Sequence, residues 1–283
     1  MKKQLIAAVI ILMLASFACS FQNLTMETTE TKWVNISENL PPNTNETELV
    51  FKMTGGSFSL NPGAQGLVNG SIMYNVEQWE PELTRRDNYF EIKQVDPFRF
   101  SGIPSGDIEN NWDLSLTTVL PINLTIEGGG SENSFNFTDL QLTNLKVVQG
   151  ASKTTLRFDT PNLLVMENLS FTTGASSAEL LGLGNANFKT MKISCGAGDY
   201  TLDFSGGLSH DADVDIKAGV SNMKIIIPAG TNAIVNNQGT ISNINTKGTW
   251  MLTNDTYATL QDGFILTINL NMAVGNVSLI HEE

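Results

Sequence analysis

Apolar residues alternate with polar ones in five segments of the second half of the chain, and each segment carries a glycine at the same place in the pattern. Apolar residues stand five and three positions before the glycine, and another stands six positions after it. The glycines recur every 21 to 24 residues, at Gly129, Gly150, Gly174, Gly196 and Gly219. Alternation with a period of two is typical of a β-strand with one buried face.

Small residues follow each of these glycines, which indicates a tight corner between two strands. A unit of strand, corner and strand cannot bury its own apolar side, but stacked units can. The spacing therefore predicts an all-β fold, a parallel β-solenoid with coils of about 21–24 residues, in which the five glycines are structural corner residues. An antiparallel β-sandwich, which turns about every 8–12 residues, is the alternative.

The same reading divides the chain into four parts. We expect a signal peptide at 1–18, a polar tether at 19–48, a β-rich N-terminal domain or cap at 49–120, and the solenoid with a C-terminal cap at 121–283. The tether is predicted because residues 20–48 are rich in Thr, Asn and Glu and offer too little apolar area to fold alone. A last repeat is predicted near the C-terminus, with Leu270, Met272 and Gly275 in the pattern.

The N-terminus has the features of an export signal. Lys2 and Lys3 precede an apolar run from Leu5 to Ala15, and small residues at 16 and 18 favour cleavage before Cys19. Cys19 is a candidate lipid attachment site, although Ser16 and Phe17 depart from the usual bacterial lipoprotein sequence. Ordinary cleavage is the alternative. We expect an exported protein at the cell surface or in the periplasm, held at the membrane through this lipid.

Composition narrows the function classes. The 283 residues include 29 acidic and 16 basic side chains, for a net charge of −13. Removing residues 1–18 takes away two lysines, which leaves 14 bases against 29 acids and a net charge of −15. Because nucleic-acid binding needs a basic surface, nucleic acid is not an expected partner. Two His and two Cys are too few for a metal cluster built on those residues, and no cofactor is expected.

Three aspartates in alternate positions, Asp211, Asp213 and Asp215, form a weak candidate for a Ca²⁺ site, because hard cations bind carboxylate oxygens. The glycine that a calcium-binding EF-hand loop has at its sixth position is absent, since Ile216 stands there. The alternative is a charged strand start. Cys195 directly precedes a corner glycine, and we expect it to be a buried structural thiol.

Catalytic groups are sparse. A Ser-His-Asp triad around His210 has no local support, and His281 is expected to be a solvated tail residue. Asp199, Asp203 and Asp215 are candidates for a carboxylate group of the kind that cleaves polysaccharides, with surface charge as the alternative. We therefore expect no enzymatic activity and no catalytic residues.

Three stretches carry a resemblance to a known family. GASSAELLGLGNANFKTMKISCGAGDYTLDFSGGL (174–208) and VDIKAGVSNMKIIIPAG (214–230) resemble the toast-rack family of exported bacterial envelope proteins. GGSFSLNPGAQGLVNGSIMYNVEQWEP (55–81) is similar to the N-terminal domain of that family. The resemblance implies a β-solenoid and an envelope role, related in fold to extracytoplasmic domains of envelope stress-response proteins, and it supplies no catalytic residues.

These observations together predict a non-catalytic envelope protein, a surface-anchored structural or adhesive solenoid that binds an envelope protein or a glycan. One alternative is an extracytoplasmic sensor or modulator of envelope stress. A second alternative is a β-helix that binds or cleaves carbohydrate.

Overall fold

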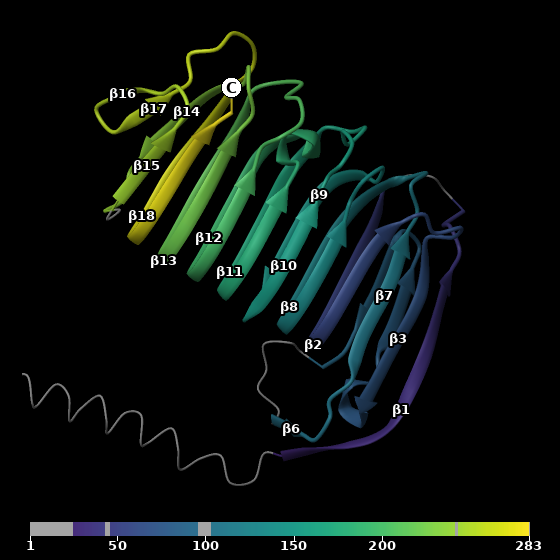
Figure 1. Ribbon diagram of the computed structural model, residues 1–283. Coiled ribbons are helices and arrows are strands. Elements are labelled where there is room, and N and C mark those ends of the chain that lie inside the picture. Colours follow the sequence, from purple (N-terminus) through teal and green to yellow (C-terminus); the bar gives the residue numbers. More distant parts are fainter. Residues whose placement is uncertain (1–24, 43–45, 96–102, 241–242, 283) are drawn as a thin grey trace, which may run out of the picture.

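The computed structural model describes residues 25–42, 46–95, 103–240 and 243–282, and these fold into one connected system of β-strands with two short 3₁₀ helices (Figure 1). The all-β class expected from the sequence is confirmed. The elements are β1 (Thr25–Glu38), β2 (Thr47–Pro62), β3 (Val68–Val76), η1 (Glu77–Trp79), β4 (Glu82–Arg86), β5 (Tyr89–Lys93), β6 (Ile103–Ser105), β7 (Asn110–Leu116), β8 (Pro121–Asn136), β9 (Gln141–Gln149), β10 (Ser152–Arg157), β11 (Met166–Leu181), η2 (Leu183–Ala186), β12 (Phe188–Asp203), β13 (Ala212–Ile227), β14 (Asn232–Asn237), β15 (Asn243–Lys247), β16 (Met251–Thr253), β17 (Thr256–Ala258) and β18 (Ile265–His281).

The middle of the chain is a stack of parallel coils. Strand β8 pairs in parallel with β9 and β10, which pair with β11, and β12, β13 and β18 follow in the same direction. Apolar repeat positions are direct neighbours in this stack, as in the series Leu145, Leu169, Met191 and Val214. The parallel pairing has the geometry of a β-solenoid rather than that of an antiparallel sandwich.

Each long strand has two arms that meet at the corner. In β12 the buried side chains have odd numbers from Met191 to Cys195 and even numbers from Tyr200 onward, so the inward side switches between Cys195 and Tyr200. The strand must also bend, because 16 extended residues span about 53 Å whereas the six residues that link β11 to β12 reach only about 20 Å. We call the residues before the corner the first arm and those after it the second arm.

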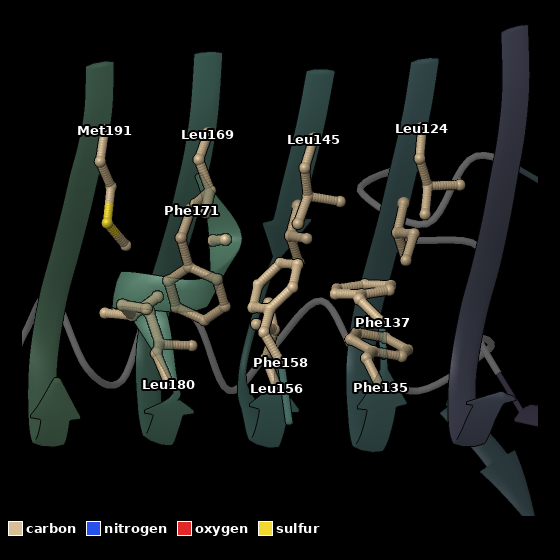
Figure 2. Packing of buried hydrophobic residues seen from close by; sticks show 14 of the residues in the cluster. Leu124, Phe135, Phe137, Leu145, Leu156, Phe158, Leu169, Phe171, Leu180 and Met191 are labelled. Carbon is tan, nitrogen blue, oxygen red and sulfur yellow. The ribbon is translucent and has the colours of Figure 1, made fainter. Parts of the chain in front are cut away.

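The core lies between the arms and is a stack of apolar side chains. Figure 2 shows Leu124, Leu145, Leu169 and Met191 in one row, and aromatic rings from the second arms below them. The ring centroids of Phe137 and Phe158 are 5.5 Å apart. Buried apolar residues from β2 to β18 belong to one continuous cluster, so the coils are stabilised mainly by contact with their neighbours.

The first coil begins earlier than the repeat predicts. Strand β2 pairs in register with β8, from Thr47 opposite Ile122 to Leu60 opposite Phe135. Residues 49–120 therefore do not form a separate core. The repeat is hidden here because Thr54 occupies the corner position, between the neighbours of Gly128 and Gly130. Strands β3, β4, β5 and β7 then cover the outer side of β2.

The expected polar tether contains a strand. Residues 25–38 form β1, which pairs antiparallel with β3, and Ile36 is only 3% exposed. The polar side chains of β1 alternate with inward Val34 and Ile36, so this segment gains stability from backbone pairing and from a few apolar contacts on an existing sheet. Its composition argues against independent folding but is compatible with an edge strand.

The last coil is formed by β18, which pairs with β13 along its whole length. Val214 lies opposite Ile268 and Ile216 opposite Leu270, so Ala273 stands at the corner. The predicted last repeat, with Gly275 at the corner, is therefore displaced by two residues. Strands β14 and β15 pair with the two arms of β18, and the antiparallel strands β16 and β17 complete this end.

Among the residues that the structure describes, no helix is long and apolar enough to cross a membrane. Cys19 and the predicted signal peptide lie outside the described residues.

Candidate interaction surfaces

The five corner glycines form one column. A Cβ atom placed on Gly150 would lie 2.8 Å from the carbonyl oxygen of Gly129, and the corresponding distances are 2.9 Å for Gly174, 2.6 Å for Gly196 and 2.4 Å for Gly219, each to the glycine of the preceding coil. Real Cβ atoms do not approach so closely. The structure therefore assigns these residues a packing role.

Behind the corner the interior is polar. The Gln149 side chain accepts a hydrogen bond from Ser131 at 2.9 Å, and Asn133 donates to Thr154 at 3.0 Å. These four side chains are buried. These polar residues stand at constant offsets in the repeat, as in Asn133 and Thr154, each four positions after its corner glycine, but polar residues at such places do not by themselves indicate burial. Their mutual hydrogen bonds offset the cost of removing them from water.

Cys195 lies in the same seam, two coils further along, and is a free, buried thiol. Burial raises its pKa from 9.0 to about 11, and hydrogen bonding with Ser221 and Tyr200 opposes this shift only partly. Burial likewise raises the pKa of Tyr200 to about 12. The thiol is therefore protonated at neutral pH and is a poor nucleophile.

This shift predicts a pH dependence of stability. The unfolded thiol loses its proton near pH 9.0, whereas the folded one keeps it to about pH 11. In that interval the folded state binds more protons, so the free energy of unfolding falls as the pH rises. We expect Cys195→Ala to weaken this decline, as measured by urea unfolding below pH 9.0 and near pH 11. A decline of the same size in the variant would contradict the assignment.

The three aspartates of the candidate Ca²⁺ site are spread along the chain around the start of β13. Asp211 precedes β13 and accepts a hydrogen bond from the backbone N–H of Ile265 at 2.8 Å. Asp213 and Asp215 point outward from β13, and Asp215 accepts a hydrogen bond from Asn269 at 3.1 Å. Among the described residues there is no group of three or more His, Cys, Asp or Glu that could hold a metal ion.

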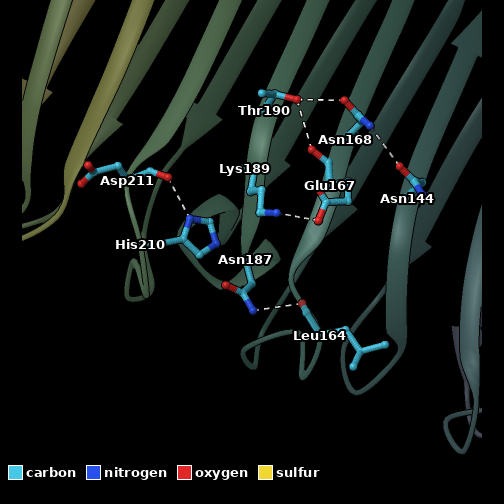
Figure 3. A network of polar contacts seen from close by, with 9 residues as sticks. All are labelled: Asn144, Leu164, Glu167, Asn168, Asn187, Lys189, Thr190, His210 and Asp211. Atoms are coloured by element: carbon cyan, nitrogen blue, oxygen red, sulfur yellow. Dashed lines mark hydrogen bonds and ion pairs between the residues drawn. The ribbon is translucent and has the colours of Figure 1, made fainter.

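One of the two histidines, His281, differs from the sequence-based expectation. His281 is 5% exposed, and its ring lies 6.0 Å from that of Trp250, so it is not a solvated tail residue. It is buried because β18 continues to this residue and the segment around Trp250 packs over it. The Nδ1 atom of His210 lies 2.8 Å from the carbonyl oxygen of Asp211 (Figure 3).

The structure does not bring Asp199, Asp203 and Asp215 together. Asp199 accepts a hydrogen bond from Asn222 at 2.9 Å on the second arm, and Asp203 accepts one from the backbone of Ser205. Asp215 stands on the first arm, opposite Lys192. Asp215 thus lies apart from the other two, and Asp199 and Asp203 stand four residues apart on β12, about 13 Å along an extended strand, which is too far for a paired acid and base.

The outer face of the first arms carries a ladder of polar side chains. Thr190 donates to Asn168 at 2.9 Å and Asn168 donates to Asn144 at 3.2 Å, as Figure 3 shows. Beside them the ammonium of Lys189 lies 2.7 Å from the carboxylate of Glu167. These side chains are largely engaged with one another across neighbouring coils.

The outer face of the second arms also runs without interruption, from β1 to β15. Register partners in one column are Trp33, Met73, Asn111, Ser57, Glu132, Lys153, Ser177, Asp199, Asn222, Asn276 and Asn243. A second column, two residues further along each strand, consists of Asn35, Ser71, Asp113, Ser59, Ser134, Thr155, Glu179, Thr201, Lys224, Ser278 and Asn245. We call this surface the second-arm face.

Two grooves hollow the second-arm face. One, of about 360 Å³, lies over β11, β12, β13, β18 and β15, and the other, of about 300 Å³, lies over β2, β8 and β10. In the second groove Lys153 lies 2.9 Å from Glu132, and this hydrogen bond raises the pKa of the lysine. The sequence repeat locates the core but gives no signal for these grooves, because they depend on residues from several coils.

The coils define the chain as a β-solenoid with long polar faces. The sequence matches the model of one family over residues 23–163 and 162–226, which together span most of the chain. The protein belongs to this family, described as the N-terminal domain of toast_rack (DUF2154). The resemblance expected from the sequence is thus confirmed.

Solved structures of similar shape come from bacteria. A "putative cell adhesion protein" from Clostridium sporogenes is 16% identical, and the match covers 89% of this chain and 99% of that one with a TM-score of 0.48. A "putative lipid binding protein" from Parabacteroides distasonis is 9% identical, with 92% and 100% covered and a TM-score of 0.41. No curated protein matches the sequence.

Proposed function

We propose that this protein is an exported, non-catalytic cell-envelope protein that acts as an anchored interaction module. The observation that carries the proposal is the second-arm face, a polar surface that continues across eleven strands and contains two grooves. A rigid stack of coils keeps such a surface in one shape, because every coil is packed between neighbours. The carboxylates considered for catalysis, Asp199, Asp203 and Asp215, are not brought together, which supports a binding role.

Membrane attachment through Cys19 is part of the proposal. Lys2, Lys3 and the apolar run before Cys19 support export, and a lipid on this cysteine would leave the folded coils outside the membrane. We expect the mature protein to begin with a diacylated Cys19 and to sediment with membranes, whereas Cys19→Ala becomes soluble. Mass spectrometry of the mature N-terminus tests this directly, and an unmodified Cys19 would disprove the anchor.

Binding to isolated envelopes tests the interaction role. The purified protein is mixed with envelope fragments from the producing cells, and the bound fraction is measured after sedimentation. We expect Thr201→Arg to reduce the bound fraction several-fold, because Thr201 lines the larger groove on β12. The matched control is Ser194→Arg, which places the same side chain on the first arm of the same strand. Absence of binding by the unaltered protein, or equal loss in both variants, would contradict the proposal.

A further inference from the structure

The two grooves of the second-arm face lie next to each other along the stack, and we call the surface that they form together the trough. The smaller groove ends at Lys153 and Thr155 on β10, and the larger begins at their register partners Ser177 and Glu179 on β11. Together they cross eight neighbouring strands, from β2 to β15, whose order is visible in Figure 1. With a strand spacing of about 4.8 Å, the trough is about 34 Å long. It therefore suits an extended polymer that lies across the strands.

The trough carries charges of both signs that nearly cancel. Its charged side chains are two lysines, Lys153 and Lys224, and three carboxylates, Glu132, Glu179 and Asp199, so their formal charges sum to −1. Lys153 is moreover paired with Glu132. A polyanion or a polycation would gain little attraction here, and an uncharged polymer fits this balance better.

The remaining lining consists mostly of amides and hydroxyls, with the buried side chains of Phe58, Ala178, Tyr200, Met223 and Val277 beneath them. Asn276 donates to Asn222 at 2.9 Å, and Asn222 donates to Asp199 at the same distance, so these planar groups are held in a fixed row. Amide and carboxylate groups present donors and acceptors side by side, which matches pairs of neighbouring hydroxyls on a sugar ring. Ser278 and Thr201 add hydroxyls in the next column.

An exposed tryptophan continues the same column beyond the trough. Trp33 on β1 is 64% exposed, and the column leads from it through Met73 and Asn111 to Ser57 in the smaller groove. Asn111 accepts a hydrogen bond from Ser57 at 2.6 Å. An indole combines a large apolar face with one polar edge, so it can stack on the apolar face of a sugar ring while the row of amides binds hydroxyls.

We propose that the trough binds an extended, uncharged glycan, with the sugar chain running across the strands toward Trp33. The strand spacing is close to the length of one sugar in an extended β-linked chain, so successive sugars meet equivalent side chains on successive coils. This inference rests on the proposed interaction role of the second-arm face and names the chemical class of its ligand.

Calorimetric titration of the mature protein tests the inference with defined probes. The probes are uncharged β-1,4-linked hexasaccharides of glucose, mannose and N-acetylglucosamine, their disaccharides, polygalacturonate as a polyanion and polylysine as a polycationic peptide. We expect at least one hexasaccharide to bind much more tightly than its disaccharide. We also expect the double substitution Asn222→Ala and Asn276→Ala to weaken that binding about tenfold or more, which corresponds to at least about 1.4 kcal/mol.

The first arms provide a matched control. Asn144→Ala with Asn168→Ala removes a hydrogen-bonded asparagine pair of the same kind from the other face, and we expect unchanged affinity. Trp33→Ala is expected to weaken hexasaccharide binding while leaving disaccharide binding unchanged. Circular dichroism and urea unfolding of each variant separate loss of contacts from loss of fold.

Three results would overturn the inference: no binding of any hexasaccharide, preference for polygalacturonate or polylysine, or equal weakening by the two asparagine pairs. The envelope sedimentation assay distinguishes these failures from failure of the proposed function. If Thr201→Arg still abolishes envelope binding while no hexasaccharide binds, the second-arm face is an interaction surface for another ligand. If the unaltered protein binds neither envelopes nor glycans, both proposals are wrong.

Discussion

Truncation of Phe171 to alanine is expected to lower the free energy of unfolding by about 3–5 kcal/mol, the range typical of fully buried phenylalanines. Phe171 is 0% exposed and lies in the middle of the stack, with Val147 and Ile193 as its register partners (Figure 2). Removal of the phenyl ring weakens the packing at two coil interfaces, because neither of the two neighbouring coils can move inward without breaking its own strand pairing. Urea unfolding monitored by circular dichroism measures the change.

The control for Phe171→Ala is an apolar truncation at the surface. Val220 is 61% exposed, so Val220→Ala is expected to change the free energy of unfolding by less than about 0.5 kcal/mol. If the two substitutions had similar effects, the second arms and the first arms would not enclose a common core.

Substitution of Gly219 by alanine is expected to cost about 1–3 kcal/mol, as for overpacking of a close-packed interior. The added Cβ would lie 2.4 Å from the backbone carbonyl oxygen of Gly196. Because this oxygen belongs to the main chain, it cannot move aside as the end of a flexible side chain could. Relief of this contact requires the two coils to separate at the corner, which weakens the neighbouring strand pairing. Urea unfolding again measures the effect.

Gly130→Ala is the matched control, because Gly130 lies one residue beyond a corner glycine and its added Cβ would meet nothing closer than 3.9 Å. Its expected effect is within about 0.5 kcal/mol. If Gly130→Ala destabilised the protein as much as Gly219→Ala, the close contact at the corner would not be the cause, because the entropy effect of Gly→Ala alone is stabilising.

The apolar spacing of the repeat is a better guide to the coils than the glycine. The first coil has Thr54 at its corner, and this side chain is tolerated because it faces Val95, to whose carbonyl oxygen it donates a hydrogen bond. The last coil has Ala273 there. In both coils the apolar positions remain at the same offsets from the corner, as in Leu49 and Phe51. The glycine pattern, by contrast, does not identify the first coil and places the last corner two residues too late.

The polar composition of residues 20–48 predicted a tether instead of a strand, because composition indicates only whether a segment can fold by itself. Strand β1 does not fold alone but is added to β3, where eight of its residues find register partners. Which segment pairs with β1 depends on contacts between residues about 40 positions apart, and the alternation in a single strand carries no information about its partner.

The sequence did not predict the second-arm face, because the residues of that face also come together only through strand pairing. Ser177, Asp199 and Asn222 stand about 22 residues apart, but Asn276 follows Asn222 by 54 residues. The reason is that β14 and β15, which come first in the sequence, lie beyond β18, and β18 inserts between them and β13. A constant repeat length therefore identifies neighbours within the middle coils but fails at β18. The trough could be recognised only once this pairing was established.

The return of β18 to β13 also sets an order of events for a chain that crosses a membrane unfolded. Each middle coil can close as soon as its own residues have emerged, since its partner precedes it directly. Strand β13 must instead wait with its outer edge open while residues 228–264 pass, because the strand that covers it comes last. An open strand edge is a template for pairing with other chains. Holdase chaperones outside the membrane would thus be needed most during this interval, and a polypeptide cut short after residue 264 would remain permanently prone to aggregation.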